Sequence, residues 1–297
     1  MTACVGVTRN ALAPNVPRAL ADACLRLGVR HRLVELNVLT TTLHPEPGVH
    51  DMDGPVAVDF LSPTLFYWQA QAVLAVKVLE MQGCRMLNSA DASLMADDKA
   101  ATALALRKAS VAQVATTAVT ADFEQVKFAA TAYGYPVVIK RTSGAQGRWV
   151  RLARDDAELA RATAELLEEG PGAILVQPVG GKRLGESVRV IVTAGAVRAA
   201  TLRHAAGGEW RSNIGAGGSQ APTALTEAER DLAVAAANAI GLGHAGIDLL
   251  RSAAGPVVLE VNSCPDFTSM TPYVGNDLAA IVVEQTLRLR EGSPAAQ

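Results

Sequence analysis

Short apolar runs bounded by turn residues recur along this chain, and in the first ninety residues they alternate with helical patterns. Residues 4–8, 31–36 and 56–61 have the apolar, β-branched character of strands, whereas 17–27 has helical spacing. Strands that alternate with helices are the sequence form of an open α/β sheet. We therefore predict an open α/β unit at the beginning of the chain.

The rest of this first unit follows the same reasoning. Residues 40–55 are rich in Thr, Pro, Gly and His, which predicts a loop. From Leu65 the apolar residues recur at spacings of three and four, which predicts a helix that ends at Gly83. A short strand at 85–88 is expected to complete the unit.

After residue 90 the pattern changes from alternation to hairpins. Helices are predicted at 95–108 and 123–132, and strands at 137–140 and 149–153 form a hairpin around a Gly-containing turn. A helix at 226–240 opens with Thr226 and Glu229, the spacing of a capping box. The remaining strands are predicted at 174–177, 188–193, 197–202, 244–250 and 257–262.

Composition excludes several classes of protein. The chain has 297 residues, of which 49% are hydrophobic and 19% charged, enough to fill one large core or two to three modest ones. Its net charge of −2 is too near neutral for a dedicated nucleic-acid binder. Every long apolar stretch is interrupted before the length of a membrane span, and no secretory signal is visible, so a cytoplasmic protein is expected. Four widely spaced cysteines are expected to be reduced thiols: Cys4, Cys24, Cys84 and Cys264.

Asp248, Glu260 and Asn262 form the strongest local signal. Glu260 and Asn262 are two residues apart on one predicted strand, so they share a face, and a turn at 252–255 brings Asp248 back to their level. The apolar neighbours of both acids make a bare carboxylate costly, and hard cations such as Mg²⁺ would offset that cost. The alternative is a pair of acids on the solvent face of a half-exposed hairpin.

Two further groups of residues indicate an anion site. Gly144 and Gly147 in the loop 142–147 would let backbone N–H groups approach phosphate oxygens, and Lys140 at the end of an apolar strand would face the same phosphates. Lys99 would add a second ammonium group at the same phosphates. The alternatives are a plain hairpin turn for the loop and a solvated helix lysine for Lys99. A polar stretch offers two guanidinium groups and an amide to one anion, although by itself it is merely a polar loop: Arg203, Arg211, Ser212 and Asn213.

The order of these motifs is similar to that of ATP-grasp carboxylate–amine ligases of the RimK-like branch, which includes ribosomal-protein glutamate ligases and LysX-type ligases. The matching motifs are a lysine at a helix start, VVIK, the loop, ILVQ, RSN, GIDLL and EVN, spread over residues 87–287. The resemblance implies an α/β (α+β) ATP-grasp fold. By this resemblance the chain would have an N-terminal open α/β pre-ATP-grasp domain at 1–90, a central subdomain with the flap loop at 91–175, and a C-terminal subdomain with metal ligands at 176–297.

The resemblance also implies roles for individual residues. Lys99 and Lys140 would contact the phosphates of ATP, and the flap loop, with Ser143, Gly144, Gln146 and Gly147, would close over them. Gln177 with the backbone of Pro178 and Val179 would hold adenine. Arg203, Arg211 and Asn213, beside Ser212, would bind the transferred phosphate and the acyl intermediate. The metal ligands would be Asp248, Glu260 and Asn262, holding two Mg²⁺ ions for which Mn²⁺ is a possible substitute.

The implied reaction has two steps. A substrate carboxylate attacks the γ-phosphate of ATP to give an acylphosphate, and an amine then displaces phosphate to leave an amide. The expected partners are an amino acid and a carboxylate substrate, which includes an acidic carrier protein or peptide C-terminus, in a homo-oligomer, either dimer or tetramer. The alternatives are an ATP-grasp phosphotransferase and a nucleotide-binding protein without turnover.

Four positions depart from the family pattern. Ser187, with Glu186 beside it, stands where the family has an Asp for the ribose hydroxyls. His204 replaces a second Arg after Arg203, and Pro178 and Val179 replace the acid and the aromatic residue of the adenine-binding hinge. These departures leave the ribose contact and the identity of the substrates open.

Overall fold

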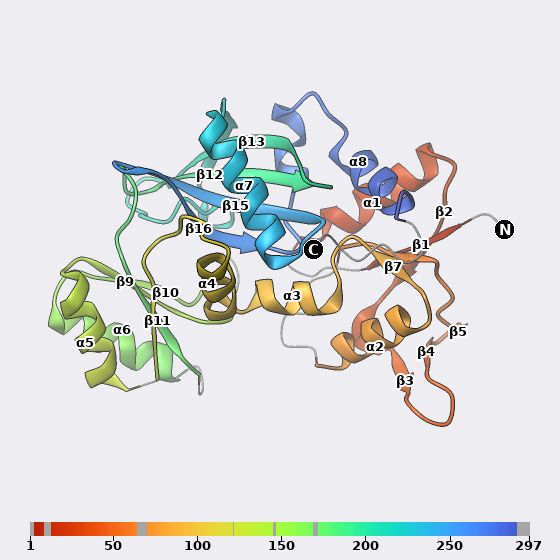
Figure 1. Ribbon diagram of the computed structural model, residues 1–297, viewed down its shortest axis with the longest axis horizontal. Coiled ribbons are helices and arrows are strands. Elements are labelled where there is room, and N and C mark those ends of the chain that lie inside the picture. Colours follow the sequence, from red (N-terminus) through yellow and green to blue (C-terminus); the bar gives the residue numbers. More distant parts are fainter. Residues whose placement is uncertain are drawn as a thin grey trace.

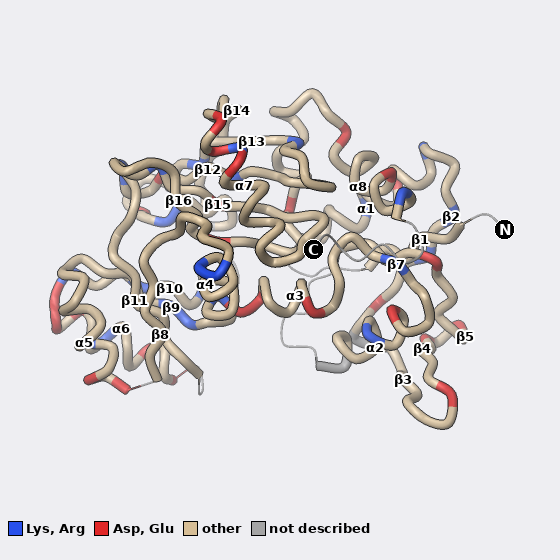
Figure 2. Tube along the Cα trace, in the orientation of Figure 1, with Lys and Arg blue, Asp and Glu red and all other residues tan. Residues whose placement is uncertain are grey.

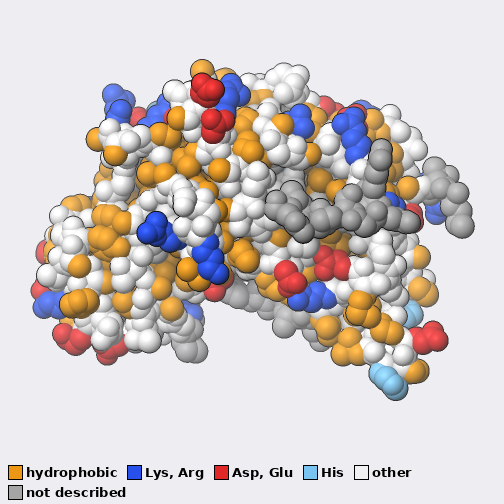
Figure 3. Space-filling view, viewed as in Figure 1, with side chains coloured by type: hydrophobic (Ala, Val, Ile, Leu, Met, Phe, Trp, Pro, Cys, Tyr) orange, Lys and Arg blue, Asp and Glu red, His pale blue; other side chains and the backbone are white. Residues whose placement is uncertain are grey.

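The computed structural model describes residues 3–8, 13–63, 70–120, 122–144, 147–168 and 172–289. Figure 1 shows an N-terminal unit on the right, a smaller sheet at the lower left, and a larger sheet above it. None of the helices within these residues is long and apolar enough to span a bilayer. On the face drawn in Figure 3, basic and acidic side chains are interspersed with apolar ones over all three parts.

The N-terminal unit is the predicted open α/β sheet. Its four strands are parallel in the order β2-β1-β6-β7. Helices α1 and α8 cover one face, and α2 covers the other. The bounds are β1 (Cys4–Thr8), α1 (Asn15–Arg26), β2 (Arg30–Val34), β6 (Phe60–Leu61), α2 (Ala70–Met81), β7 (Arg85–Met86) and α8 (Leu278–Leu287). The predicted helix start at Leu65 lies outside the described residues, and α8 was not predicted.

The prediction of a loop at 40–55 was wrong. After a 3₁₀ turn, η1 (Leu36–Val38), this stretch forms a three-stranded antiparallel sheet of β3 (Thr40–Thr42), β4 (Gly48–Asp51) and β5 (Gly54–Pro55). Val49 is buried in the core that contains α2, which gives the stretch an apolar anchor despite its polar composition. The backbone N–H of Val56 also bonds to Val49 O at 2.8 Å, so the predicted strand at 56–61 is shortened to β6.

The predicted helix at 95–108 is two helices, α3 (Ala90–Asp97) and α4 (Lys99–Lys108). The break lies at Asp98, whose backbone is extended and whose Oδ1 accepts hydrogen bonds from Ala100 N at 2.8 Å and Ala101 N at 3.1 Å. Such a side chain satisfies the unpaired N–H groups of a new helix, so a cap ends one helix and begins the next. Lys99 therefore becomes the first residue of α4.

The central part is a four-stranded antiparallel sheet in the order β10-β9-β11-β8, packed on α5 and α6. Its core contains Ile139, Leu159 and Val176. Strand β8 was not predicted, and the proposed division at residue 175 falls within β11. The bounds are β8 (Thr117–Val119), α5 (Phe123–Tyr133), β9 (Val137–Arg141), β10 (Val150–Ala153), α6 (Asp156–Glu168) and β11 (Ile174–Pro178).

The largest part is a five-stranded antiparallel sheet in the order β14-β13-β12-β15-β16. Helix α7 packs on one face with α3 and α4, and the predicted capping box of Thr226 and Glu229 is confirmed. The opposite face carries the polar residues described below. The bounds are β12 (Glu186–Thr193), β13 (Ala196–His204), η2 (Ile214–Ala216), β14 (Ser219–Pro222), α7 (Glu227–Ile240), β15 (His244–Ser252), β16 (Gly255–Asn262) and η3 (Thr268–Tyr273).

Candidate active site

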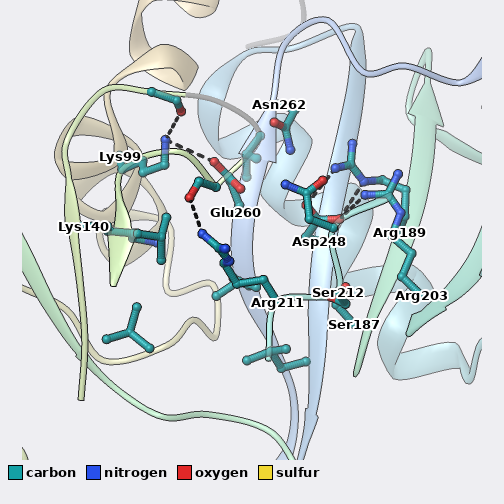
Figure 4. Close-up of a pocket in the computed structure, with 18 of the residues that line it drawn as sticks. Lys99, Lys140, Ser187, Arg189, Arg203, Arg211, Ser212, Asp248, Glu260 and Asn262 are labelled. Carbon is teal, nitrogen blue, oxygen red and sulfur yellow. Dashed lines mark hydrogen bonds and ion pairs between the residues drawn. The ribbon is translucent and has the colours of Figure 1, made fainter. Parts of the chain in front are cut away.

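One pocket of about 490 Å³ lies between the five-stranded sheet and the central sheet, a volume in the range of small-molecule sites. Basic residues of α4, β9 and β12 lie in this part of the molecule (Figure 2). In Figure 4, Lys99 and Lys140 lie on one side of the pocket and Arg189, Arg203 and Asp248 on the other, with Glu260 between them. All the described residues of the predicted site line this pocket. Gln146 lies outside the described residues.

The pairing of β15 with β16 brings the three predicted metal ligands together. Asp248 lies directly opposite Glu260, and Asn262, two residues further, lies opposite Gly246. The amide nitrogen of Asn262 donates to Gly246 O at 3.3 Å, which leaves its oxygen as a ligand atom. Two carboxylates and an amide oxygen form a donor set that suits a hard cation such as Mg²⁺. Within the residues described, no group of three or more His, Cys, Asp and Glu side chains is arranged for a metal ion.

Asp248 is held by an arginine that the sequence reasoning did not place in the site. Arg189 Nε donates to Asp248 Oδ1 at 2.6 Å, and its Nη2 donates to Oδ2 at 2.8 Å. Both side chains are only 10% exposed, so burying either charge without the other would be costly. The available signal was the spacing, because Arg189 follows Ser187 by two residues on a strand and so shares its face of the sheet.

The close approach of Arg189 explains a glycine on β15. A Cβ on Gly246 would lie 2.6 Å from Arg189 Nη1 and 2.6 Å from Pro265 Cβ, distances that real Cβ atoms do not show. Any larger residue at this position would displace either the guanidinium or the segment after β16. Gly246 therefore leaves the space in which Arg189 reaches Asp248.

Arg203 lines the pocket and has a buried donor without a partner among the described residues. Its nearest guanidinium nitrogen lies 3.7 Å from Asp248 Oδ1, and its Nε is buried without a partner among the described residues. Burial, together with the neighbouring charge of Arg189, lowers the pKa of Arg203 to about 10. Burying such a donor without a partner is costly. Arg203 also lines the pocket, so an anion bound there would lie beside its guanidinium group.

The opposite wall presents two lysines. Lys99 Nζ donates to Gly144 O at 2.6 Å and lies 3.2 Å from Glu260 Oε1. Lys140 on β9 is buried, and burial lowers its pKa to about 8, assisted by the charge of Lys99. Burial alone would raise the pKa of Glu260, but Lys99 and Lys140 outweigh it and hold that pKa below its usual value. The carboxylate is thus ionised between two cations.

Arg211 connects the two sides of the pocket. Its Nη1 donates to Gly147 O at 2.8 Å, and its Nη2 donates to Glu209 Oε2 at 2.7 Å. The hydrogen bond from Arg211 lowers the pKa of Glu209 to about 2.

Gly144 has a φ of +132°, and a Cβ there would lie 2.5 Å from Trp149 Cδ1, so the flap loop requires glycine at this position. Asn213 caps η2 by accepting from Gly215 N at 3.2 Å.

The far end of the pocket contains the residues predicted for adenine and ribose. Gln177 Nε2 donates to Thr116 Oγ1 at 2.7 Å, and Pro178 and Val179 follow it at the end of β11. Ser187 Oγ lies 2.6 Å from Ser212 Oγ, so two hydroxyls stand together where the family pattern has one acid. Glu186 lies 3.3 Å from Arg183 Nη1 and 3.5 Å from His204 Nδ1.

The family model of the RimK-like ATP-grasp domain matches residues 96–286. This chain belongs to the RimK-like ATP-grasp family. The matched part contains every residue predicted for the site, from Lys99 to Asn262. The match confirms the family that the order of the motifs predicted.

Curated relatives of this RimK-like ATP-grasp chain are similar to it over part of their length. A probable alpha-L-glutamate ligase of Aliivibrio fischeri (strain MJ11) is 42% identical over 151 residues, which are 51% of this chain and 50% of the relative. The match thus spans about half the length of the curated relatives.

Two solved structures share the fold. A RimK domain ATP-grasp protein from Sphaerobacter thermophilus DSM 20745 superposes with a TM-score of 0.75 at 21% identity, covering 96% of this chain and 100% of that one. The ATP-grasp ligase PsnB, solved with a minimal precursor, Mg and ADP, gives a TM-score of 0.70 at 17% identity, covering 97% of this chain and 99% of PsnB. These similarities confirm the predicted ATP-grasp fold.

Proposed function

We propose that this protein is an ATP- and Mg²⁺-dependent carboxylate–amine ligase, which forms an amide bond through an acylphosphate. The observation that carries the proposal is the buried guanidinium of Arg203 lining the same pocket as two lysines and three convergent oxygen ligands. Cations around a hard-metal donor set suit a magnesium-bound triphosphate. The names of the curated relatives, probable alpha-L-glutamate ligases, support the same reaction class.

In this proposal the nucleotide lies along the pocket. Adenine binds at Gln177, Pro178 and Val179, and the paired hydroxyls of Ser187 and Ser212 bind the ribose with Glu186 beside them. Lys99 and Lys140 contact the phosphates. The flap loop, with Ser143, Gly144, Gln146 and Gly147, covers them. The proposed domains are the pre-ATP-grasp domain at 1–90 and the two subdomains at 91–175 and 176–297.

Asp248, Glu260 and Asn262 would hold two Mg²⁺ ions, for which Mn²⁺ is a possible substitute. Bound there, the ions supply charge neutralisation for phosphoryl transfer. Arg189 fixes the orientation of Asp248, and Lys99 fixes that of Glu260, so the ligands are arranged before the nucleotide binds. Such preorganisation lowers the cost of reorganisation during the reaction.

Arg203, Arg211 and Asn213 are the proposed catalytic residues. A carboxylate oxygen of the acyl substrate attacks the γ-phosphorus, and the bond to the bridging oxygen of ADP breaks. Arg203 binds the resulting acylphosphate through its guanidinium group, while Arg211 exchanges the carbonyl of Gly147 for a phosphate oxygen. The amine then attacks the acyl carbon, and the bond from that carbon to the phosphate oxygen breaks.

The relatives also indicate which substrates to test. L-Glutamate is the first candidate for the amine, because the curated relatives are named for it. The lysines and arginines of the pocket favour an acidic acyl donor, such as the C-terminus of a glutamate-rich peptide or carrier protein. A cytoplasmic homo-oligomer, either dimer or tetramer, remains part of the proposal.

The test is the appearance of ADP and phosphate when a triglutamate peptide is supplied with each proteinogenic amino acid in turn. We expect release only when both substrates are present, and a product heavier than the acid by the amino acid less water. Glu260→Ala should lower kcat by about 10²–10³-fold, whereas Glu227→Ala on the exposed surface of α7 should not. A phosphorylated product would identify a phosphotransferase, and ATP binding without turnover would identify a binding protein; either contradicts the proposal.

A further inference from the structure

The pocket extends beyond the proposed phosphate site to a second end. This end is formed by the segment that follows β16, in which Ser263, Cys264, Pro265, Asp266 and Ser269 line the pocket. The nucleotide, as placed above, does not occupy it. It directly follows Asn262 in the chain, which is one of the proposed metal ligands.

Contacts with the sheet fix the position of this segment. Pro265 packs on Gly246, because a Cβ there would lie 2.6 Å from Pro265 Cβ. Gln220 pairs with Arg203 in the register of β13 and β14, and its Nε2 donates to Ser269 O at 2.6 Å. Asp266 lies between these two anchors. It is therefore held over the sheet on the side where Arg203 and Asp248 project.

The carboxylate of Asp266 has one oxygen available. Its Oδ1 accepts hydrogen bonds from Thr268 N at 2.9 Å and Thr268 Oγ1 at 2.6 Å. No hydrogen bond to its Oδ2 occurs among the residues the structure describes. The negative charge of Asp266 also opposes the lowering of the pKa of Arg203.

The other carboxylates in this part of the pocket are already committed. Asp248 is bound by Arg189, and Glu260 lies against Lys99. Both also belong to the proposed metal site. Of these three carboxylates, Asp266 is the one that lies outside the proposed metal site.

We propose that Asp266 is a catalytic residue that binds the ammonium group of the incoming amine and accepts one of its protons. The proposal rests on the ligase activity proposed above. A carboxylate suits this task, because it attracts the cationic form of the amine and can hold the proton that the amine must lose.

The step balances without any further reactant. One proton passes from the ammonium group to Asp266 Oδ2, and the nitrogen lone pair then forms the C–N bond. The C–O bond to phosphate breaks, and its electron pair leaves with the phosphate oxygen. The second proton lost from nitrogen passes to the phosphate, and Asp266 returns its proton to solvent.

The experiment uses Asp266→Asn and two nucleophiles. Asn keeps an oxygen for the bonds from Thr268 but lacks the charge and the basicity. Acylphosphate formed from ATP and triglutamate is trapped by hydroxylamine, which is mostly uncharged at neutral pH. It attacks without first losing a proton, and the one proton that it loses on forming the hydroxamate passes to the released phosphate. We expect Asp266→Asn to leave hydroxamate formation near the wild-type rate while amide formation with L-glutamate falls about 10²–10⁴-fold.

Controls separate this idea from the proposed function. Asp266→Glu should recover part of the amide-forming rate, and Asp231→Asn on exposed α7 should match the wild type in both assays. Equal loss of both reactions, or loss of neither, in Asp266→Asn would overturn the role of Asp266. Failure of the wild type to form any hydroxamate or amide would instead overturn the ligase itself.

Discussion

The two walls of the pocket hold their cations in different ways. On the sheet wall, made of β12, β13, β15 and β16, Arg189 binds a buried carboxylate through two hydrogen bonds. On the flap wall, made of β9, the start of α4 and the flap loop, Lys99 donates to a backbone carbonyl, and Arg211 reaches across to another. Both bonds to carbonyls can be exchanged for phosphate oxygens at little cost, whereas the buried ion pair cannot be broken cheaply. The difference indicates that the cation on the sheet wall is held in place, whereas those on the flap wall can change their hydrogen-bond partners.

The largest expected effect is the loss of the buried ion pair on the sheet wall. Arg189→Met removes both hydrogen bonds to the buried Asp248 and leaves only Arg203, at 3.7 Å, beside its charge, which should lower the free energy of unfolding by about 3–5 kcal/mol. Urea denaturation measures this change. The double variant Arg189→Met with Asp248→Leu should recover most of the loss, because it removes the unpaired charge. A single variant as stable as the wild type would contradict a fixed sheet wall.

A smaller effect concerns Lys140, whose buried ammonium charge is costly until a phosphate pairs with it. Its pKa of about 8 lies below the ordinary value of 10.5. Between these pH values the unfolded chain binds more protons, so the free energy of unfolding should rise with pH by roughly 3 kcal/mol from this residue. Lys140→Met should lack that rise, and exposed Lys108→Met should keep it. Denaturation at several pH values measures both, and parallel profiles for wild type and Lys140→Met would exclude this contribution.

The smallest effect is expected for the half-buried pair of Arg211 and Glu209. Glu209→Gln removes the charge beside Arg211, whose side chain is 31% exposed, and should cost no more than about 1 kcal/mol of unfolding free energy. Measured in the same urea series, it is the matched comparison for Arg189→Met. A loss as large as that of Arg189→Met would remove the distinction between the walls.

Much of this site could be predicted because it depends on local spacing. Two strands joined by a tight turn have only a few registers, so Asp248, Glu260 and Asn262 could be placed together from their positions alone. The capping box of Thr226 and Glu229 is equally local, since both side chains act within one turn of helix. Predictions of this kind need no knowledge of distant contacts.

The rest depends on contacts between distant parts of the chain. Arg189 binds a carboxylate 59 residues away, and neither side chain indicates its partner from the sequence. Residues 40–55 form strands because Val49 reaches the core beneath α2, a contact that composition does not reveal. Asp98 divides α3 from α4 by capping, yet within an Ala-rich stretch it resembles an ordinary surface residue.

The acylphosphate intermediate is tested most directly by following one oxygen atom of the acyl substrate. If the acyl substrate carries isotopically heavy oxygen in its carboxylate, an acylphosphate intermediate transfers one of those atoms to the released phosphate. Mass spectrometry or phosphorus NMR of that phosphate should therefore detect the heavy isotope in proportion to the amide formed. Unlabelled phosphate accompanying amide formation would contradict the proposed chemistry of this pocket.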